Sequence, residues 1–350
     1  MGDFNWSKPR TSSIEYVLVD PKTNTELELL GYCKGGKISY NLNTALKVSA
    51  DLEVDKPKDL KDNLLRIYFN ATDTNGATIR YPLATLYASA PRSVLNIGRQ
   101  TASIEGYSRL LRLKEEAYLT SYPIPKGTKI IPLVVSMIEK SGLTCLYPES
   151  EAKTTSQLLF KAGTSKLEVI NELLSVAGFS SLKVNGLGDA VISRAQDING
   201  APPLYTFRDD EASIIYSGMQ QERDWYSVPN VVICVCSSQD NTIVSTPAKN
   251  TDPNDPFSIP SRGREIVRVE EYSDVADKAT LDAKAKLLLQ TSSLKMESIE
   301  FDHAYIPLSV GDVCRLEIEQ FNINGNYTIQ SMDVELTQAL KTSTRVRRFV

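Results

Sequence analysis

The single histidine, His303, is the residue that most restricts the chemistry open to this 350-residue chain. Ser-His-Asp and Cys-His triads, His-rich zinc sites and H-E-x-x-H helices all need imidazole in a defined arrangement. His303 stands at the predicted end of a strand, where we expect a hydrogen-bonded residue at the surface or rim rather than a base. Most hydrolase and metalloenzyme mechanisms therefore find no support in the sequence.

Paired carboxylates are the one catalytic arrangement that 43 acidic residues leave open, because glycosidases need only two of them about 5 to 10 Å apart. The densest acidic points are Asp209–Glu211 and Glu270–Glu271. Both adjoin predicted turns or helix starts, where solvation and the helix dipole already account for acidic side chains. We assign no catalytic residue.

Sequence motifs for phosphate and metal binding are also absent. The sequence holds no P-loop, no nucleophile elbow and no dinucleotide fingerprint after a strand. The glycine cluster Asn185–Asp189 lies between two short predicted strands and is expected to be a plain turn. Asp252–Asp255 lacks the alternating ligands and terminal glutamate of a calcium loop, so we expect a solvated loop. No cofactor-binding residue, metal ligand or cofactor is predicted.

The five cysteines do not form a disulfide pattern, because their number is odd and no C-x-x-C occurs among them. Cys234 and Cys236 alternate within a predicted strand, which places both on one face. We expect them to behave as small core residues.

Composition defines the class of protein. The chain carries 39 Lys+Arg against 43 Asp+Glu, a net charge of −4, with 41% hydrophobic residues, as in an ordinary soluble globular protein. This balance argues against stable nucleic-acid binding by charge. No apolar window is long enough to span a membrane and no secretory signal opens the chain, so we expect folding and assembly in a cytoplasm. The length suggests two or three domains.

Hydrophobic periodicity divides the chain into three segments. Residues 1–115 read as strands, among them 46–54, in which alternate apolar residues face one way while Lys47 and the other polar residues face solvent. The strongest hairpin signal is Asp73–Gly76. Residues 116–228 contain two amphipathic helices, one starting near a predicted Thr128 cap and one near a Ser165–Glu168 capping box. Residues 229–350 return to strands.

The third segment carries two further features. A proline-rich stretch, Thr246–Ser261, is predicted to be an exposed loop outside any sheet. A helix capped by Ser273 is predicted over 273–291. The predicted fold is therefore α+β and mainly β: a first β domain over 1–115, a small α+β domain over 116–228, and a second β domain over 229–350 with the inserted helix.

Three stretches, taken in order, resemble the baseplate hub proteins of contractile phage tails and the N-terminal domains of tail-associated proteins of long-tailed phages. The first is Glu105–Leu111, and the second is the helix between Gly127 and Leu143. The third is the ending formed by 276–289, Ile306–Val313 and Gly325–Ser331. In that ending Gly311 suits a tight turn, Gly325 would permit positive φ in a hairpin, and Tyr327 would pack on a sheet face.

The resemblance implies two β domains, each of barrel or sandwich form and similar to a tail-tube subunit. Three chains would then form a homotrimeric ring that caps the six-fold tail tube, joins it to the tail tip and lets DNA pass during host cell entry. The implied partners are the tail-tube or distal tail protein, the tape-measure protein and a spike or receptor-binding protein. The implied place is the tail tip of the virion.

Two other functions stay open on the sequence: a carboxylate-based hydrolase of cell-wall carbohydrate, and a distal tail or adaptor ring protein. Many relatives continue into a hydrolase or receptor-binding extension, whereas this sequence ends at Val350. We therefore expect wall-degrading activity to reside on another polypeptide, and no enzymatic activity in this chain.

Overall fold

The computed structural model describes residues 4–6, 10–31, 33–55, 60–89, 92–96, 99–194, 201–211, 213–224, 226, 228–237, 243–272, 278–292 and 296–349. The predicted class, α+β and mainly β, is confirmed. No helix among these residues is long and apolar enough to cross a membrane.

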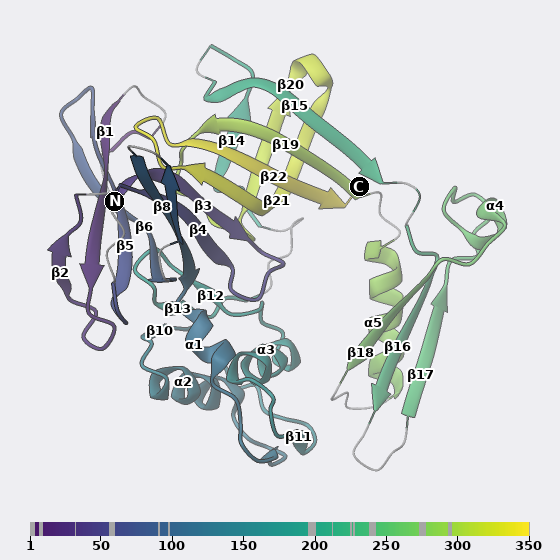
Figure 1. Ribbon diagram of the computed structural model, residues 1–350. Helices are drawn as coiled ribbons and strands as arrows, with labels where there is room; N and C mark the ends of the chain where they lie inside the picture. Colours follow the sequence, from purple (N-terminus) through teal and green to yellow (C-terminus); the bar gives the residue numbers. More distant parts are fainter. Residues whose placement is uncertain are drawn as a thin grey trace.

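Strands from the first third of the chain form one half of a large sheet, in the order β3-β4-β8-β6-β5-β1-β2 with β7 paired to β8 (Figure 1). Burial in β4 alternates strictly along its length, as the sequence predicts, because successive side chains point to opposite faces. The predicted Asp73–Gly76 turn joins β5 to β6, and Gly76 has a φ of 83°. The bounds are β1 Arg10–Val19, β2 Glu26–Leu29, β3 Cys33–Asn41, β4 Val48–Val54, β5 Leu64–Asp73, β6 Thr78–Ala88, β7 Arg92–Asn96 and β8 Arg99–Ser108.

The other half of the sheet comes mainly from the end of the chain, in the order β15-β19-β22-β21, with β20 pairing to both β21 and β14. Tyr327 packs fully buried in its core, as predicted. The prediction for Gly325 is wrong: Gly325 lies within β21, and the turn is made by a 3-10 turn (Glu319–Phe321) and Asn322 with a φ of 54°. The bounds are β14 Tyr205–Arg208, β15 Ile215–Asp224, β19 Met296–Ala304, β20 Val313–Ile318, β21 Ile323–Glu335 and β22 Lys341–Phe349.

The two halves are one continuous sheet. β21 pairs antiparallel with β3, from Ser331 opposite Asn41 to Glu335 opposite Lys37. Buried residues from the end of the chain, including Val334 and Leu340, therefore belong to the core of the first half. The 14-stranded order of the described residues runs as an open path between β15 and β2 and does not close into a barrel.

The α+β unit beneath the first half has its own core, in which α1, α2 and α3 bury their apolar faces (Figure 1). The predicted capping box at Ser165 and Glu168 opens α3. The predicted cap of α2 is wrong: its N-cap is Lys129, and the Thr128 hydroxyl donates instead to the Pro125 carbonyl at 2.7 Å. The bounds are α1 Leu110–Glu115, β9 Tyr122–Ile124, α2 Ile130–Lys140, β10 Cys145–Leu146, β11 Leu158–Phe160, α3 Lys166–Val176, β12 Lys183–Val184 and β13 Ala190–Val191.

A second small unit is inserted between β15 and β19 and stands to one side of the main sheet (Figure 1). Its sheet has the order β17-β16-β18, and α5 packs on β16 and β17. The predicted inserted helix is present from Lys278, whereas its predicted cap Ser273 lies outside the described residues. The bounds are β16 Val231–Ser237, β17 Ile243–Lys249, α4 Ile259–Arg262, β18 Val267–Tyr272 and α5 Lys278–Ser292.

The prediction that Thr246–Ser261 stays outside any sheet is wrong at its start. Thr246 and Ala248 are buried in β17, and Pro247 lies opposite Ile233 of β16. Proline is tolerated there because β17 is an edge strand, so its missing N–H leaves no ladder bond unmade.

The predicted divisions at residues 115 and 228 stay predictions. Strand pairing shows only that β14 and β15, which lie within the predicted middle segment, are hydrogen-bonded to β20 and β19 of the predicted last segment. We propose that the natural divisions follow this pairing, with the second β half made of 201–224 and 296–349.

Candidate functional site

The only histidine is buried rather than at the surface or rim, so that part of its prediction is wrong. His303 is 1% exposed, and its Nδ1 lies 2.8 Å from the Ala304 carbonyl and its Nε2 2.8 Å from the Thr344 hydroxyl. Because a carbonyl only accepts, Nδ1 carries the proton and Nε2 accepts from Thr344. Burial lowers the pKa of His303 to about 4. The imidazole is thus a neutral bridge between β19 and β22 that has both nitrogens engaged.

The predicted acidic points have structural partners. Asp209 accepts a backbone hydrogen bond from Gln320 at 3.1 Å, and this bond with a second one from Glu319 lowers the pKa of the Asp209 carboxyl. Glu270 forms an exposed ion pair with Arg268 at 2.5 Å. A glycosidase acid requires a raised pKa, whereas the pKa of Asp209 is lowered.

The remaining motifs also have structural roles. Among the described residues no group of three or more His, Cys, Asp or Glu side chains is arranged to hold a metal ion. In the Asp252–Asp255 loop, Asp255 accepts a hydrogen bond from Asn250. All five cysteines lie in the described part of the chain and none forms a disulfide, and Cys234 and Cys236 join the core under α5, as predicted.

The ends of the main sheet are the surfaces that could bind another chain. Among the described residues, β2 and β15 terminate the main path of the strand order, and β7 and β14 end its two side branches, so each is an edge strand. All four side chains of β2 are exposed, with Leu27 at 53% and Leu29 at 64%. Exposed leucines on an edge strand are an aggregation liability unless another protein covers them.

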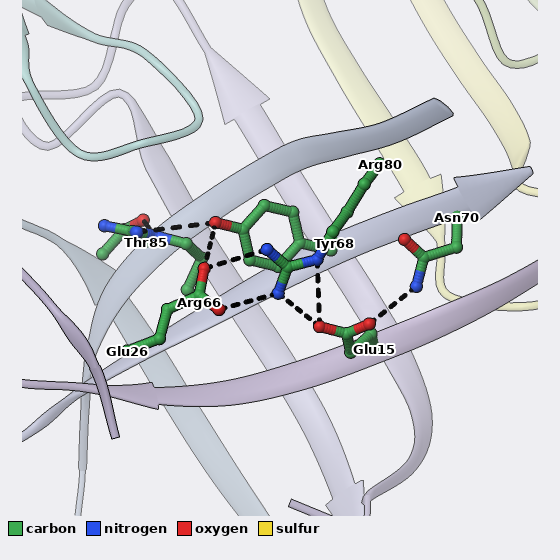
Figure 2. A network of polar contacts seen from close by, with 7 residues as sticks. All are labelled: Glu15, Glu26, Arg66, Tyr68, Asn70, Arg80 and Thr85. Atoms are coloured by element: carbon green, nitrogen blue, oxygen red, sulfur yellow. Dashed lines mark hydrogen bonds and ion pairs between the residues drawn. The ribbon is translucent and has the colours of Figure 1, made fainter. Parts of the chain in front are cut away.

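A polar network behind β2 fixes this edge on the sheet (Figure 2). Arg80 of β6 reaches across β5 to bind Glu15 of β1 and Glu26 of β2, and its guanidinium stacks over the Tyr68 ring at 3.7 Å. The Tyr68 hydroxyl also donates to Glu26 at 2.7 Å. The bond from Arg80 is the largest cause that lowers the pKa of Glu26. The charges thus hold the edge strand in one position.

The glycine cluster is more than the plain turn that we predicted, because it docks the α+β unit onto the first half of the sheet. The Gly186 carbonyl accepts from the Thr85 hydroxyl at 2.9 Å, and the Leu187 carbonyl accepts from the buried Arg66 at 3.1 Å. A Cβ atom on Gly186 would lie 1.9 Å from the carbonyl oxygen of Pro82. Only glycine allows this backbone approach.

A cavity of about 490 Å³ lies where the two β halves and the α+β unit meet. β3 and β6 supply Tyr40 and Leu83, the α+β unit supplies Lys183 and Arg194, and the C-terminal half supplies 308–312 with Thr328. Lys47 also lines it and is 5% exposed with a φ of 63°, so its predicted place on the solvent face is wrong. The strand begins only at Val48, and the turn before it directs Lys47 inward.

Sequence reasoning missed Lys47, Arg66 and Arg109 as buried cations. Arg109 is 3% exposed and donates to the Gly142 carbonyl at 2.8 Å, which ties the end of β8 to the turn after α2. Burial lowers the pKa of Arg109. The only signal in the sequence is that Lys47 and Arg66 each stand between two apolar residues, while Arg109 directly precedes two leucines.

Comparison with solved structures finds this fold in several tail proteins. The tail protein of Neisseria meningitidis MC58 superimposes with a TM-score of 0.71 at 14% identity, covering 97% of each chain. The 43 kDa tail protein of prophage MuSo2 from Shewanella oneidensis gives 0.67 at 12% identity, covering 96% of this chain and 98% of its own. Prophage tail protein gp18 of Listeria monocytogenes gives 0.57 at 13% identity, covering 95% and 94%. No protein-family model and no curated sequence matches.

Proposed function

We propose that this chain is the structural hub protein of a phage-type tail. Three copies form a ring that caps the distal end of the tail tube and joins it to the tail tip, so that DNA passes through the lumen during host cell entry. The observation that carries the proposal is the likeness to phage tail proteins over nearly the whole chain. The protein then belongs to the virion tail and assembles in the host cytoplasm.

The open sheet edges support assembly into a ring. The exposed leucines of β2 lie at one end of the strand order and β15 at the other. We propose that copies pair these two unlike edges, which makes the contact heterologous. A heterologous contact must close by rotation to give a finite particle. The proposed partners beyond the ring are the tail-tube or distal tail protein, the tape-measure protein, and a spike or receptor-binding protein.

Mass photometry of the purified protein tests the ring. We expect a particle of three times the 38.8 kDa chain mass. The double variant Leu27→Lys and Leu29→Lys places charges on the β2 edge and should give monomers. Leu119→Lys is the matched control, because Leu119 is 94% exposed and lies between α1 and β9, outside the strands of the main sheet. A monomeric wild-type protein contradicts the proposal, and a six-fold particle favours the distal ring alternative.

We also propose that the chain has no enzymatic activity, which separates a hub from the cell-wall hydrolase alternative. The acidic points that could have formed a glycosidase pair are exposed and engaged by Arg268 or by backbone N–H groups. Incubation of the purified protein with host cell walls should release no soluble muropeptides. Release that is abolished by Asp209→Asn or Glu270→Gln would overturn the proposal.

A further inference from the structure

The cavity at the junction has a charge opposite to that of the protein. Its charged lining consists of Lys47, Lys183, Arg194 and Asp312, a net charge of +2 in a chain whose net charge is −4. These residues come from three separate parts of the fold, so the excess of positive charge exists only once the parts are assembled. None of the tail contacts discussed above uses it.

Lys47 is the strongest sign that the cavity holds a ligand. Its ammonium group donates one hydrogen bond, to the Leu42 carbonyl at 2.5 Å, which leaves two N–H groups. No carboxylate forms an ion pair with it in the part of the chain that the structure describes, and the nearby charge is that of Lys183. A buried ammonium without a counter-charge is costly, so such groups are normally paired.

Two further groups in the lining have hydrogen-bonding capacity to spare. Lys183 donates to the Val310 carbonyl at 3.0 Å and retains two N–H groups. The Thr328 hydroxyl is buried, and no hydrogen-bond partner for it is present among the described residues. A buried polar atom without a partner is uncommon in folded proteins.

We propose that this cavity binds a small organic anion through a carboxylate or phosphate group. Lys47 and Lys183 donate to the anionic oxygens, and Thr328 supplies a third hydrogen bond. The volume of about 490 Å³ is in the range of small-molecule sites. Asp312 disfavours ligands of high negative charge and favours one that also carries a hydrogen-bond donor, such as a hydroxy acid or a sugar phosphate. The bound anion would join the two β halves and the α+β unit.

Isothermal titration calorimetry of the full chain with glycerate, glycerol 3-phosphate and inorganic phosphate tests the site, with sodium chloride at equal ionic strength as the blank. We expect saturable binding of one anion per chain. Lys47→Met and Lys183→Met should each weaken it at least about tenfold, because each removes charge-assisted hydrogen bonds. Lys129→Met is the matched control, since Lys129 pairs with Glu151 on the surface and should leave binding unchanged. The glycerate and phosphate arms distinguish carboxylate from phosphate recognition.

Thr328→Val keeps the shape of the side chain and should lower the affinity severalfold without affecting folding. If Lys47→Met fails to fold, as judged by circular dichroism, the Thr328→Val variant tests the proposed site in its place. Absence of saturable binding by all three anions overturns the proposal. Binding that is equally strong in the Lys183→Met and Thr328→Val variants also overturns it, because the ligand would then lie elsewhere. The proposal is independent of the assignment to a phage tail.

Discussion

Substitution of Gly186 by alanine tests whether the glycine cluster docks the α+β unit onto the sheet. The added Cβ would lie 1.9 Å from the Pro82 carbonyl oxygen and 2.7 Å from its carbon, both backbone atoms. Since a relaxed carbon–oxygen contact is about 3.3 Å, the loop must withdraw by about 1.4 Å. That movement breaks the 2.9 Å bond from Thr85 to the Gly186 carbonyl and the 3.1 Å bond from Arg66 to the Leu187 carbonyl.

The cost follows from these two bonds. A neutral hydrogen bond contributes about 1 kcal/mol and one from a charged donor about 2 kcal/mol, so we expect Gly186→Ala to lower the free energy of unfolding by about 3 kcal/mol. Guanidinium denaturation followed by circular dichroism measures the loss, and limited proteolysis should show faster cleavage within the α+β unit. Gly31→Ala is the matched control, because nothing lies within 4 Å of its added Cβ. A Gly186→Ala protein within about 0.5 kcal/mol of wild type would refute the docking role.

Three further predictions concern the second half of the sheet. Glu297→Gln should lower the free energy of unfolding by about 3 kcal/mol, because it leaves the partly buried Arg348 beside a neutral amide. The control Glu300→Gln, on the exposed face of the same strand, should lower it little. Chemical denaturation measures both variants. Burial lowers the pKa of His303 in the folded protein to about 4, so between pH 6.5 and 4 the unfolded chain binds one more proton than the folded chain. The free energy of unfolding should therefore fall by about 3 kcal/mol as the pH drops from 6.5 to 4. Thermal unfolding measured over this pH range should show the fall in the wild type, and His303→Leu should abolish it. Replacing residues 225–295 by Asn-Gly should leave a folded, soluble protein by circular dichroism; an insoluble product would show that the inserted unit supports the main sheet.

The parts of the fold that depend on local chemistry could be predicted from the sequence. The strict alternation of β4, the Asp73–Gly76 hairpin and the capping box of α3 each need only neighbouring residues to specify them. The error at Pro247 has a different origin. Proline excludes a strand only where its N–H would be needed, and whether β17 lies at an edge is decided by its partners.

The buried basic residues and the cavity could not be predicted, because they arise from contacts between distant parts of the chain. The alternating pattern predicts that Lys47 is a strand residue that faces solvent, but the strand begins only at Val48. The burial of His303 depends on Thr344, which lies 41 residues away on β22. The net charge of the cavity depends on Lys183 and Lys47 meeting across two units. Neither the composition nor the spacing of residues along the sequence indicates which of these distant residues come into contact.

The register at the edge of the main sheet explains why the inserted unit is separable. Asp224 at the end of β15 lies opposite Met296 at the start of β19, so the two strands are hairpin neighbours that a two-residue turn could join. The inserted unit has its own core of Val232, Cys234 and Ala248 against Leu281 and Ala285 of α5. It therefore lies at the β15 end of the strand order, opposite the β2 edge, and a ring built from these two edges would bring it against the neighbouring chain. The Asn-Gly replacement should thus preserve the fold of the main sheet. Any loss of ring formation in that variant would then measure the contacts that the inserted unit makes with the neighbouring chain.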